Sequence, residues 1–354
     1  MPQGMFLKSD GFATNLYDRG SEFTLEGYCK REGIAYANRG LPVSLETFIA
    51  YGLEFQRRFV PELEDRRVLA VRPLAQGFLL TCDDGETFTA SQVVVATGIS
   101  YFHYIPKVLS DLPEEFVTHS SKHSSLAHFN GRDVTVLGGG SSAVDIAASL
   151  LDSGAAARLV VRAPSIKFLN PPIAVRPSWL KTLRTPSSGL GPGWRSRLCT
   201  DAPLLFRLMP ERFRLRIVRT HLGPSATSYV REKVDGKMPV LVGTQVRSAE
   251  IRGNKICLQL VRDTGAELEL ETDHVIAATG YKVDLRRLPF FDEQALSAIR
   301  TVDHTPILSS NFESSISGLY FVGLASANTF GPMLRFAFGA GFTSRRLTRH
   351  FRRG

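Results

Sequence analysis

A glycine-rich turn between a strand-length run and a helix-length run constrains this chain more than any other feature of its sequence. The apolar run Val134–Leu137 leads directly into GGGSSA at residues 138–143, and Val144–Leu151 follows with the composition of a helix. A second short apolar run stands at Leu159–Val161. Strand, G-x-G-x-x-A turn, helix and strand in this order are typical of a dinucleotide-binding unit.

Each position of the turn has a physical task. Gly138 permits the tight turn, Gly140 lets a pyrophosphate approach bare backbone, and Ala143 lets the helix pack closely on the strand. Ser141 and Ser142 stand at the helix N-terminus, where backbone N–H groups and the helix dipole attract phosphate. We therefore expect these residues to bind the pyrophosphate of a dinucleotide.

The residue that follows the second strand predicts which dinucleotide is bound. NAD-selective proteins carry an acid there for the ribose 2′-hydroxyl, whereas this chain has Arg162. A guanidinium matches a 2′-phosphate, and Arg158 and Lys167 add positive charge nearby. NADPH is therefore the predicted coenzyme. The alternative is that Arg162 is a solvated residue at a strand end.

Length and patterning predict two domains, because 354 residues exceed what one small core usually holds. Near the start, the sequence predicts a helix over Leu45–Phe59, whose apolar positions Phe48, Ile49, Leu53 and Phe55 recur near helical spacing. Short β-rich runs over Val68–Ala96 then predict a small β-meander, with Val93–Val95 as its last strand before Ala96-Thr97-Gly98.

The second block of the chain holds the glycine turn and closes on another Ala-Thr-Gly, at residues 278–280. An insertion rich in Pro, Gly and Arg, Pro164–Pro239, interrupts this block and contains both tryptophans. Its amphipathic stretch Leu204–Leu222 is expected to form helices over the core. The sequence assigns the insertion no chemical role.

Composition excludes several classes of function. The four cysteines, Cys29, Cys82, Cys199 and Cys257, form no CxxC pair, which argues against a zinc site, a thiol redox couple and a secreted disulfide framework. No apolar stretch approaches roughly eighteen residues and the start carries no signal segment, so we expect no membrane span and a cytoplasmic location. The net charge of +9 lies partly in the Arg-rich tail, interpreted as a solvated helix face rather than a nucleic-acid site.

Rival motifs carry less weight than the glycine turn. Tyr229 and Lys233 have the Tyr-x-x-x-Lys spacing of short-chain dehydrogenases, but that family places its dinucleotide turn at the N-terminus. His119-Ser120-Ser121 has no G-x-S-x-G elbow to make it a hydrolase site. The histidines lack a spacing such as H-E-x-x-H, so no metal is expected.

With these pieces in order, the chain resembles the flavin-containing monooxygenases and, more closely, the microbial lysine/ornithine N-hydroxylases. The resemblance spans nearly the whole sequence. Seven segments carry it: Phe6-Leu7-Lys8, Ala96-Thr97-Gly98, His119-Ser120-Ser121, Gly138 to Ala143, Ala278-Thr279-Gly280-Tyr281, Gly318 to Gly323, and Phe330-Gly331-Pro332.

The resemblance implies an α/β protein with two Rossmann-like, three-layer domains. The FAD domain would be discontinuous, formed by residues 1–130 and 282–354, and the NADPH domain would occupy 131–281. NADPH would reduce FAD, and a flavin hydroperoxide formed with molecular oxygen would pass one oxygen atom to a small-molecule soft nucleophile such as an amine nitrogen.

Site residues follow from the same resemblance. Lys8 and Asn15 would approach the flavin and the substrate as the catalytic pair, and a helix starting near Met333 would direct its N-terminus at the flavin. The remaining cofactor contacts would come from Thr97, Gly98, Thr279, Gly280, Gly323, Gly331 and Pro332.

The chain also departs from the family pattern. Residues 1–67 contain no G-x-G, although the family opens with a strand and a G-x-G-x-x-G turn for the FAD pyrophosphate. We therefore expect an N-terminally truncated FAD domain, with no strand–turn–helix unit there and an open gap beside Val93–Val95. A truncated NADPH-binding pseudoenzyme without flavin turnover is the alternative function. A disulfide reductase is disfavoured by the missing CxxC.

Overall fold

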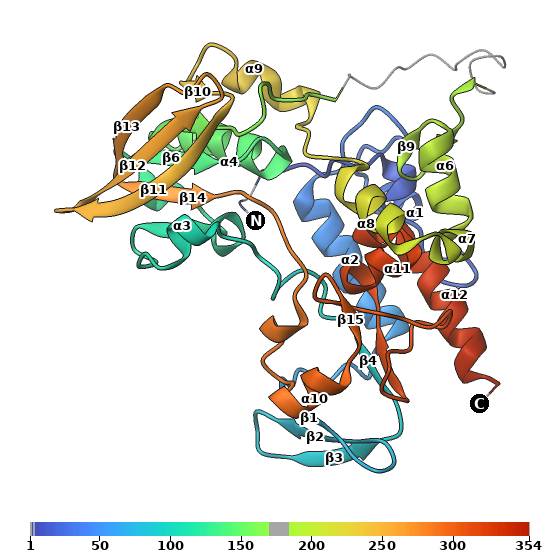
Figure 1. Ribbon diagram of the computed structural model, residues 1–354. Helices are drawn as coiled ribbons and strands as arrows, with labels where there is room; N and C mark the ends of the chain where they lie inside the picture. Colours follow the sequence, from blue (N-terminus) through green and yellow to red (C-terminus); the bar gives the residue numbers. More distant parts are fainter. Residues whose placement is uncertain (1, 3, 170–183, 354) are drawn as a thin grey trace.

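The computed structural model describes residues 2, 4–169 and 184–353, and the largest sheet among them is five-stranded and parallel and lies at one side of the molecule (Figure 1). The strand order is β10-β7-β6-β14-β5. Two helices and a three-stranded antiparallel sheet, β11-β12-β13, accompany it. The bounds are β5 Val117–His119, β6 Asp133–Leu137, β7 Ala156–Val160, β10 Val240–Leu241, β11 Thr244–Arg252, β12 Lys255–Arg262, β13 Glu267–Thr272, β14 His274–Ala277, α3 Lys107–Ser110 and α4 Ser141–Asp152.

Two apolar clusters make this region a three-layer unit. On one face, α4 packs Ile146 and Leu150 into a fully buried cluster with Val136 of β6. On the other, Leu258 of β12 joins Val160 and the strand residues beside it. Each fully buried aliphatic side chain stabilises the fold by about 1.5–3 kcal/mol. The predicted α/β class and the strand–turn–helix–strand order are confirmed.

A second, two-stranded parallel sheet pairs β4 (Val93–Val95) with β17 (Leu319–Phe321). Among the described residues β4 has no other partner strand, and Val94 is 39% exposed. Residues 4–67 likewise contain helices and no named strand. Both findings agree with the gap expected beside Val93–Val95.

The β-meander differs from its prediction in one strand. Its members are β1 (Val68–Pro73), β2 (Phe78–Cys82) and β3 (Thr87–Ala90). The prediction that Val93–Val95 closes the meander was wrong. The hairpin turn after β2 sends the chain directly into β3, and β4 then leaves to pair in parallel with β17.

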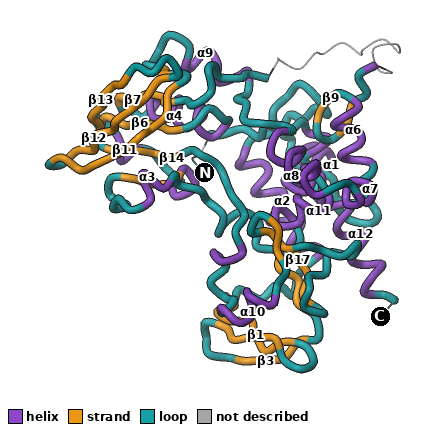
Figure 2. Tube along the Cα trace, viewed as in Figure 1, coloured by secondary structure: helices purple, strands orange, loops and turns teal. Residues whose placement is uncertain are grey.

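Helices fill the side of the molecule opposite the large sheet, as the purple segments of Figure 2 show. Near the start lie η1 Gly11–Ala13, α1 Leu25–Arg31 and α2 Leu45–Phe59, so the predicted helix is confirmed to the residue. Of its apolar positions, Ile49 and Leu53 are half exposed. Tyr51, fully buried, anchors α2 instead through its stacked contact with Phe23.

The insertion forms short helices, as expected, over the core. They are α6 Trp194–Asp201, α7 Pro203–Leu208, α8 Glu211–Thr220, η4 Ser228–Val230 and α9 Arg231–Val234, with the small strands β8 Ser187–Ser188 and β9 Gly191–Pro192 before them. Phe206 and Ile217 are buried in the cluster beneath α7 and α8. The part of the insertion at 170–183, which includes Trp179, lies outside the described residues.

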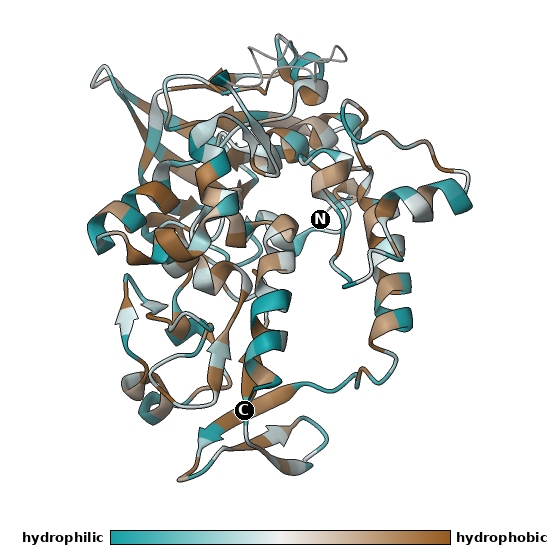
Figure 3. Cartoon of the chain, turned by 90° about the vertical axis from the view of Figure 1, so that its right-hand side faces the viewer, coloured by the Kyte–Doolittle hydropathy of each residue, from teal (hydrophilic) through white to brown (hydrophobic). Residues whose placement is uncertain are grey.

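The remaining elements are short, except for the C-terminal helix. They are η2 Ser120–Lys122, η3 Ala127–Phe129, η5 Leu285–Arg287, α10 Glu293–Ala298, β15 Thr301–Val302, β16 Thr305–Pro306, η6 Gly323–Ser326, α11 Ala327–Phe330, η7 Pro332–Arg335, η8 Ala337–Gly339 and α12 Ala340–Phe351. No helix within the described ranges is long and apolar enough to cross a bilayer. Figure 3 shows hydrophilic turns on α12 just before the C-terminus.

Candidate functional site

The glycine turn has the backbone that a dinucleotide turn requires. Gly138 lies at the carboxyl end of β6 with φ of +140°, a conformation that favours glycine, and a Cβ there would overlap the carbonyl oxygen of Ala278. Its N–H donates to Val160 O at 3.0 Å, which ties the turn to β7. Ala143 is fully buried against the strand, as predicted for close helix packing.

Gly140 differs from Gly138 in what surrounds it. A Cβ at Gly140 would meet only Pro224, at 3.4 Å, which is ordinary contact. The protein itself therefore leaves room for a side chain at Gly140. A phosphate approaching the helix N-terminus is what would exclude one, so the structure is compatible with the predicted cradle.

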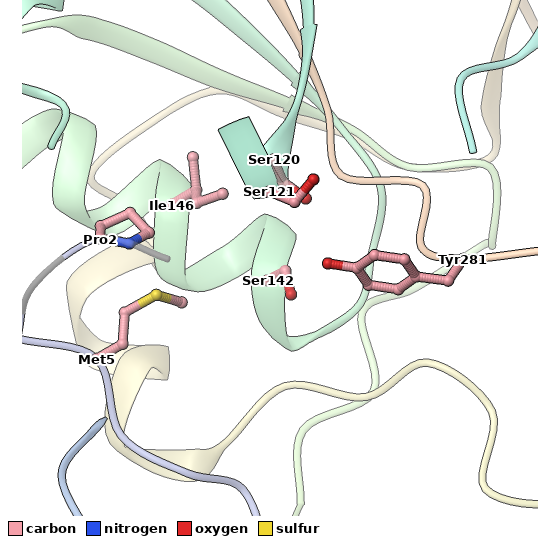
Figure 4. A pocket seen from close by; sticks show the side chains of 7 residues that line it. All are labelled: Pro2, Met5, Ser120, Ser121, Ser142, Ile146 and Tyr281. Atoms are coloured by element: carbon pink, nitrogen blue, oxygen red, sulfur yellow. The ribbon is translucent and has the colours of Figure 1, made fainter. Parts of the chain in front are cut away.

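Ser142 and Ser121 meet Tyr281 at a small pocket of about 20 Å³ beside this turn (Figure 4). The hydroxyls of the three residues gather there, and Pro2 and Met5 of the N-terminal segment close one side. Burial raises the pKa of Tyr281, and a hydrogen bond with Ser121 opposes that rise. The other turn serine, Ser141, donates to Asp145 Oδ2 at 3.1 Å.

The second Ala-Thr-Gly lies next to the glycine turn because β14 and β6 are parallel neighbours. Ala278 N donates to Leu137 O at 2.9 Å. Thr279 Oγ1 donates to Tyr104 O, and the carbonyl of Gly280 accepts from Tyr104 N at 2.9 Å. Thr279 and Gly280 thus hold the loop beside the turn, and cofactor contact for them remains a prediction.

Arg162 stands beyond the end of β7 with an exposed side chain. It makes no hydrogen bond or ion pair with the residues that the structure describes. The expectation that Arg158 adds charge here was wrong. Arg158 instead pairs with Asp133, at the amino end of β6, and donates to Glu271 O at 3.1 Å.

Thr97, Gly98 and Gly323 come together at a different edge. They follow β4 and β17, which are parallel, so their carboxyl ends share one edge of the small sheet. Gly98 has φ of +62° and Gly323 +64°, and a Cβ on either would point into open space. In open α/β sheets ligands bind outside the carboxyl ends of strands.

A cavity of about 780 Å³ lies between the N-terminal segment, α6–α7 and α12. Asn15 and Met333 line it. Asn15 also has a structural task, since its Oδ1 accepts from Leu25 N at 2.8 Å. The volume of this cavity is in the range of small-molecule and cofactor sites.

The predicted helix near Met333 was wrong. Pro332–Arg335 is a 3-10 turn of four residues, and α12 begins only at Ala340. Gly331 has φ of +103°, and a Cβ there would lie 3.4 Å from the ring of Phe206. The extended backbone of Phe336, with φ of −129° and ψ of 155°, ends the turn, so no helix continues from Met333.

Lys8 links the N-terminal segment to the loop above the glycine turn. Its Nζ donates to Ser225 Oγ at 2.6 Å and to Ser225 O at 3.1 Å. Burial and the neighbouring Arg335 lower the pKa of Lys8, and Asp145 opposes them. Burial likewise raises the pKa of Asp145 to about 6, against its hydrogen bond from Ser141 and the charge of Lys8.

Sequence reasoning missed part of this arrangement. Asp145 was not predicted, and Tyr281 and Ser121 were noted only as parts of motifs. Ser225 is fixed by a contact across more than two hundred residues of sequence. An acid inside an amphipathic helix, such as Asp145, gives no signal of its own beforehand.

Buried histidines surround the sheet below the site. His119 Nε2 donates to Gly280 O at 3.0 Å, so its Nδ1 accepts from Ser121 Oγ at 2.8 Å. His274 Nδ1 donates to Glu115 O, and its Nε2 therefore accepts the proton of Thr118 Oγ1 at 2.8 Å. Thr118 Oγ1 then accepts from His123 Nε2 at 2.7 Å. Burial lowers the pKa of all three histidines to about 4.

These histidines predict a loss of stability in acid. Their pKa is about 4 in the fold and about 6.5 in the unfolded chain. Full stability is therefore present above pH 6.5 and falls as the pH drops toward 4, by up to about 1.4 kcal/mol per pH unit for each histidine. Asp145 has a raised pKa in the fold, so it stabilises the fold as the pH drops from 6 to 4. This gain cancels the loss of stability from about one of the three histidines in that range.

Urea unfolding at a series of pH values measures this slope. Between pH 4 and 6 the three histidines and the opposing Asp145 leave a net slope of about two groups, so His123→Gln should reduce it by roughly half. A stability that does not change between pH 7 and 4.5 would show that the three histidines are not neutral groups of the fold.

One family profile and two known proteins match parts of this sequence. The profile of the pyridine nucleotide-disulphide oxidoreductases matches residues 55–189. A ferredoxin–NADP reductase from Thermus thermophilus is 34% identical over 93 residues, 25% of this chain and 27% of that protein. The rice (Oryza sativa subsp. japonica) indole-3-pyruvate monooxygenase is 28% identical over 280 residues, 73% of this chain and 58% of that protein. The chain thus spans less than two thirds of either relative.

Solved structures match over almost the whole chain. A cadaverine monooxygenase of desferrioxamine biosynthesis from Erwinia amylovora, bound to FAD, is 18% identical, with a TM-score of 0.72 over 98% of this chain and 83% of that one. An ornithine N-hydroxylase from Kutzneria sp. 744, with reduced FAD, NADP⁺ and L-ornithine, is 17% identical, with a TM-score of 0.70 over 94% and 83%. This chain shares its fold with these two structures. The family resemblance predicted from the sequence is confirmed.

Disulfide reductases share this flavoenzyme fold, as the bacillithiol disulfide reductase from Staphylococcus aureus shows with a TM-score of 0.60 at 18% identity. All four cysteines of this chain are free and buried. Burial raises the pKa of Cys29, Cys82, Cys199 and Cys257. A raised pKa keeps a thiol protonated and unreactive, so these cysteines are unsuited to disulfide exchange.

Proposed function

We propose that the chain is an FAD- and NADPH-dependent monooxygenase that inserts one oxygen atom into a soft nucleophile, such as the nitrogen of a small amine. One observation carries the proposal. The N-terminal segment runs from the glycine turn, where Met5 contacts the pocket of Ser142, to the 780 Å³ cavity, which Phe12 and Asn15 line. A single stretch of about ten residues therefore connects the two candidate cofactor sites.

The residues around the glycine turn are suited to binding NADPH. Gly140 leaves bare backbone at the N-terminus of α4, and Ser141 and Ser142 begin that helix. These residues would hold the pyrophosphate. Arg162, exposed and without an acid partner among the described residues, would hold the 2′-phosphate.

The residues proposed to bind FAD are suited to only part of that cofactor. Thr97, Gly98 and Gly323 would lie along the ribityl chain, and Gly331 and Pro332 would lie near the flavin at the wall of the cavity that Met333 lines. No second glycine turn for the FAD pyrophosphate occurs in the described residues. We assign residues 1–130 and 282–354 to this side and 131–281 to the NADPH side.

Bound FAD would supply the electron transfer from NADPH and the activation of oxygen. The chain's own residues would position and shield this chemistry. Lys8, whose pKa is lowered, lies between the loop at Ser225 and the carboxyl of Asp145, and Asn15 lines the cavity further along the same segment. Both are proposed to approach the substrate, with Lys8 able to release its proton more readily than an exposed lysine because burial disfavours its charged form.

The solved neighbours support this substrate class, since their names specify cadaverine and ornithine as what they hydroxylate or bind. A second candidate is an NADPH-binding protein without flavin turnover. It is favoured by the single dinucleotide turn found within residues 4–169 and 184–353.

NADPH oxidation separates the two functions. The purified protein, mixed with FAD and a diamine, is expected to oxidise NADPH faster than without the amine and to form a hydroxylated amine, detected by mass spectrometry. Asn15→Ala should reduce product formation more than NADPH affinity. A protein that binds NADPH but takes up no flavin and forms no product would instead support the second candidate.

A further inference from the structure

The insertion presents a surface that the oxidoreductase chemistry does not use. Its helices α6, α7 and α8 bury one face each, through Cys199, Phe206 and Ile217. Their outward faces carry large apolar side chains instead. We name these the insertion patch: Leu198 is 59% exposed, Leu208 73% and Phe213 48%.

The helical geometry shows that this exposure is systematic. In α6, Leu198 stands about 100° from Cys199 and 200° from Ser196, so it lies across the helix from the buried side. In α7, Leu208 stands about 200° from Phe206, which points to the core. In Figure 3, where this side of the molecule faces the viewer, hydrophobic and hydrophilic helical turns stand side by side.

Arginines border the patch. Arg195, Arg212 and Arg216 are exposed, and none of them forms an ion pair with a described residue. Their neighbours Arg197 and Arg219 do form ion pairs, with Asp201 at 2.5 Å and Asp303 at 2.8 Å. The patch therefore combines exposed leucines with a surplus of positive charge.

Charge decides between possible occupants. If a second copy of this chain covered the patch around a two-fold axis, the arginines of both copies would face each other and repel. An anionic lipid surface complements both features, because apolar side chains enter the boundary between headgroups and acyl chains while arginines bind the phosphates. We propose that the insertion patch docks this protein on anionic membranes, as a peripheral contact rather than a span.

Vesicle sedimentation tests the proposal. The full chain is mixed with vesicles of phosphatidylcholine alone or of phosphatidylcholine with phosphatidylserine. It should sediment with the anionic vesicles only, and added salt should weaken the binding. Arg212→Glu with Arg216→Glu should weaken it at least tenfold, since each basic residue near such a surface is worth about fivefold. Leu198→Ser with Leu208→Ser should reduce binding by a similar factor.

Matched controls lie elsewhere on the surface. Leu63→Ser, at a side chain that is 61% exposed, and Arg57→Glu should bind vesicles as the wild type does. Unchanged NADPH affinity verifies that every variant is folded. Equal sedimentation with both kinds of vesicle, or no sedimentation, would overturn the proposal. So would a dimer that the leucine variants dissociate, or capture of an acidic protein in place of vesicles.

Discussion

Replacing Gly140 with valine should abolish NADPH binding while leaving the fold intact. A Cβ at this position meets the protein only at Pro224, at 3.4 Å. The same Cβ would occupy the space through which a pyrophosphate reaches the backbone at the N-terminus of α4. The affinity should fall at least a hundredfold, about 2.7 kcal/mol or more, with Gly140→Ala showing a smaller loss. Fluorescence titration with NADPH and a thermal melt measure the two effects.

Gly138→Val is the matched control for this variant. Gly138 has φ of +140°, and its Cβ would overlap the carbonyl of Ala278. This substitution should therefore lower the melting temperature, which Gly140→Val should not. If Gly140→Val binds NADPH as well as the wild type, the pyrophosphate does not lie at this turn.

Arg162→Ala should remove most of the preference for NADPH over NADH. The exposed guanidinium makes no ion pair with the described residues, so it is available for a 2′-phosphate. Hydrogen bonds to charged groups contribute about 1.5–3 kcal/mol, which corresponds to roughly a ten- to hundredfold preference. NADH binding should hardly change, because the pyrophosphate contacts remain. Titration of both coenzymes against both proteins measures the ratio.

Arg158→Ala separates a coenzyme contact from a general loss of charge. Arg158 lies on β7 but pairs with Asp133 at the opposite end of the strands. Its removal should lower stability and leave the NADPH to NADH ratio unchanged. If Arg162→Ala loses affinity equally for both coenzymes, Arg162 has a structural role. If it loses affinity for neither, Arg162 is only a solvated surface residue.

Features specified by short stretches of sequence were predicted well. The β6–turn–α4–β7 unit follows from apolar runs and glycine spacing, and α2 was placed to the residue from its apolar spacing. The structure shows that Ser44 caps this helix by accepting from Thr47 N. The resemblance predicted the flavoenzyme fold. Loop glycines with positive φ, such as Gly98 and Gly323, stood at strand ends where the motifs put them.

Features that depend on distant contacts were not predicted. The parallel pairing of Val93–Val95 with Leu319–Phe321 joins segments more than two hundred residues apart, and local β-propensity alone placed the first in the meander. Arg158 and Arg162 look alike in sequence, yet Arg158 pairs with Asp133 of the neighbouring strand β6, whereas Arg162 lies beyond the end of β7. The insertion patch emerged only when burial showed which helix faces remain uncovered.

Anaerobic mixing of the FAD-treated protein with NADPH tests the central claim most directly, because it isolates the meeting of the two cofactor sites along residues 5–15. The account predicts that the protein retains FAD through gel filtration and that NADPH bleaches the flavin's visible absorbance, much faster than NADH does. It also predicts that Gly140→Val retains the flavin but is not bleached. A protein that binds NADPH tightly yet leaves bound flavin oxidised would contradict it.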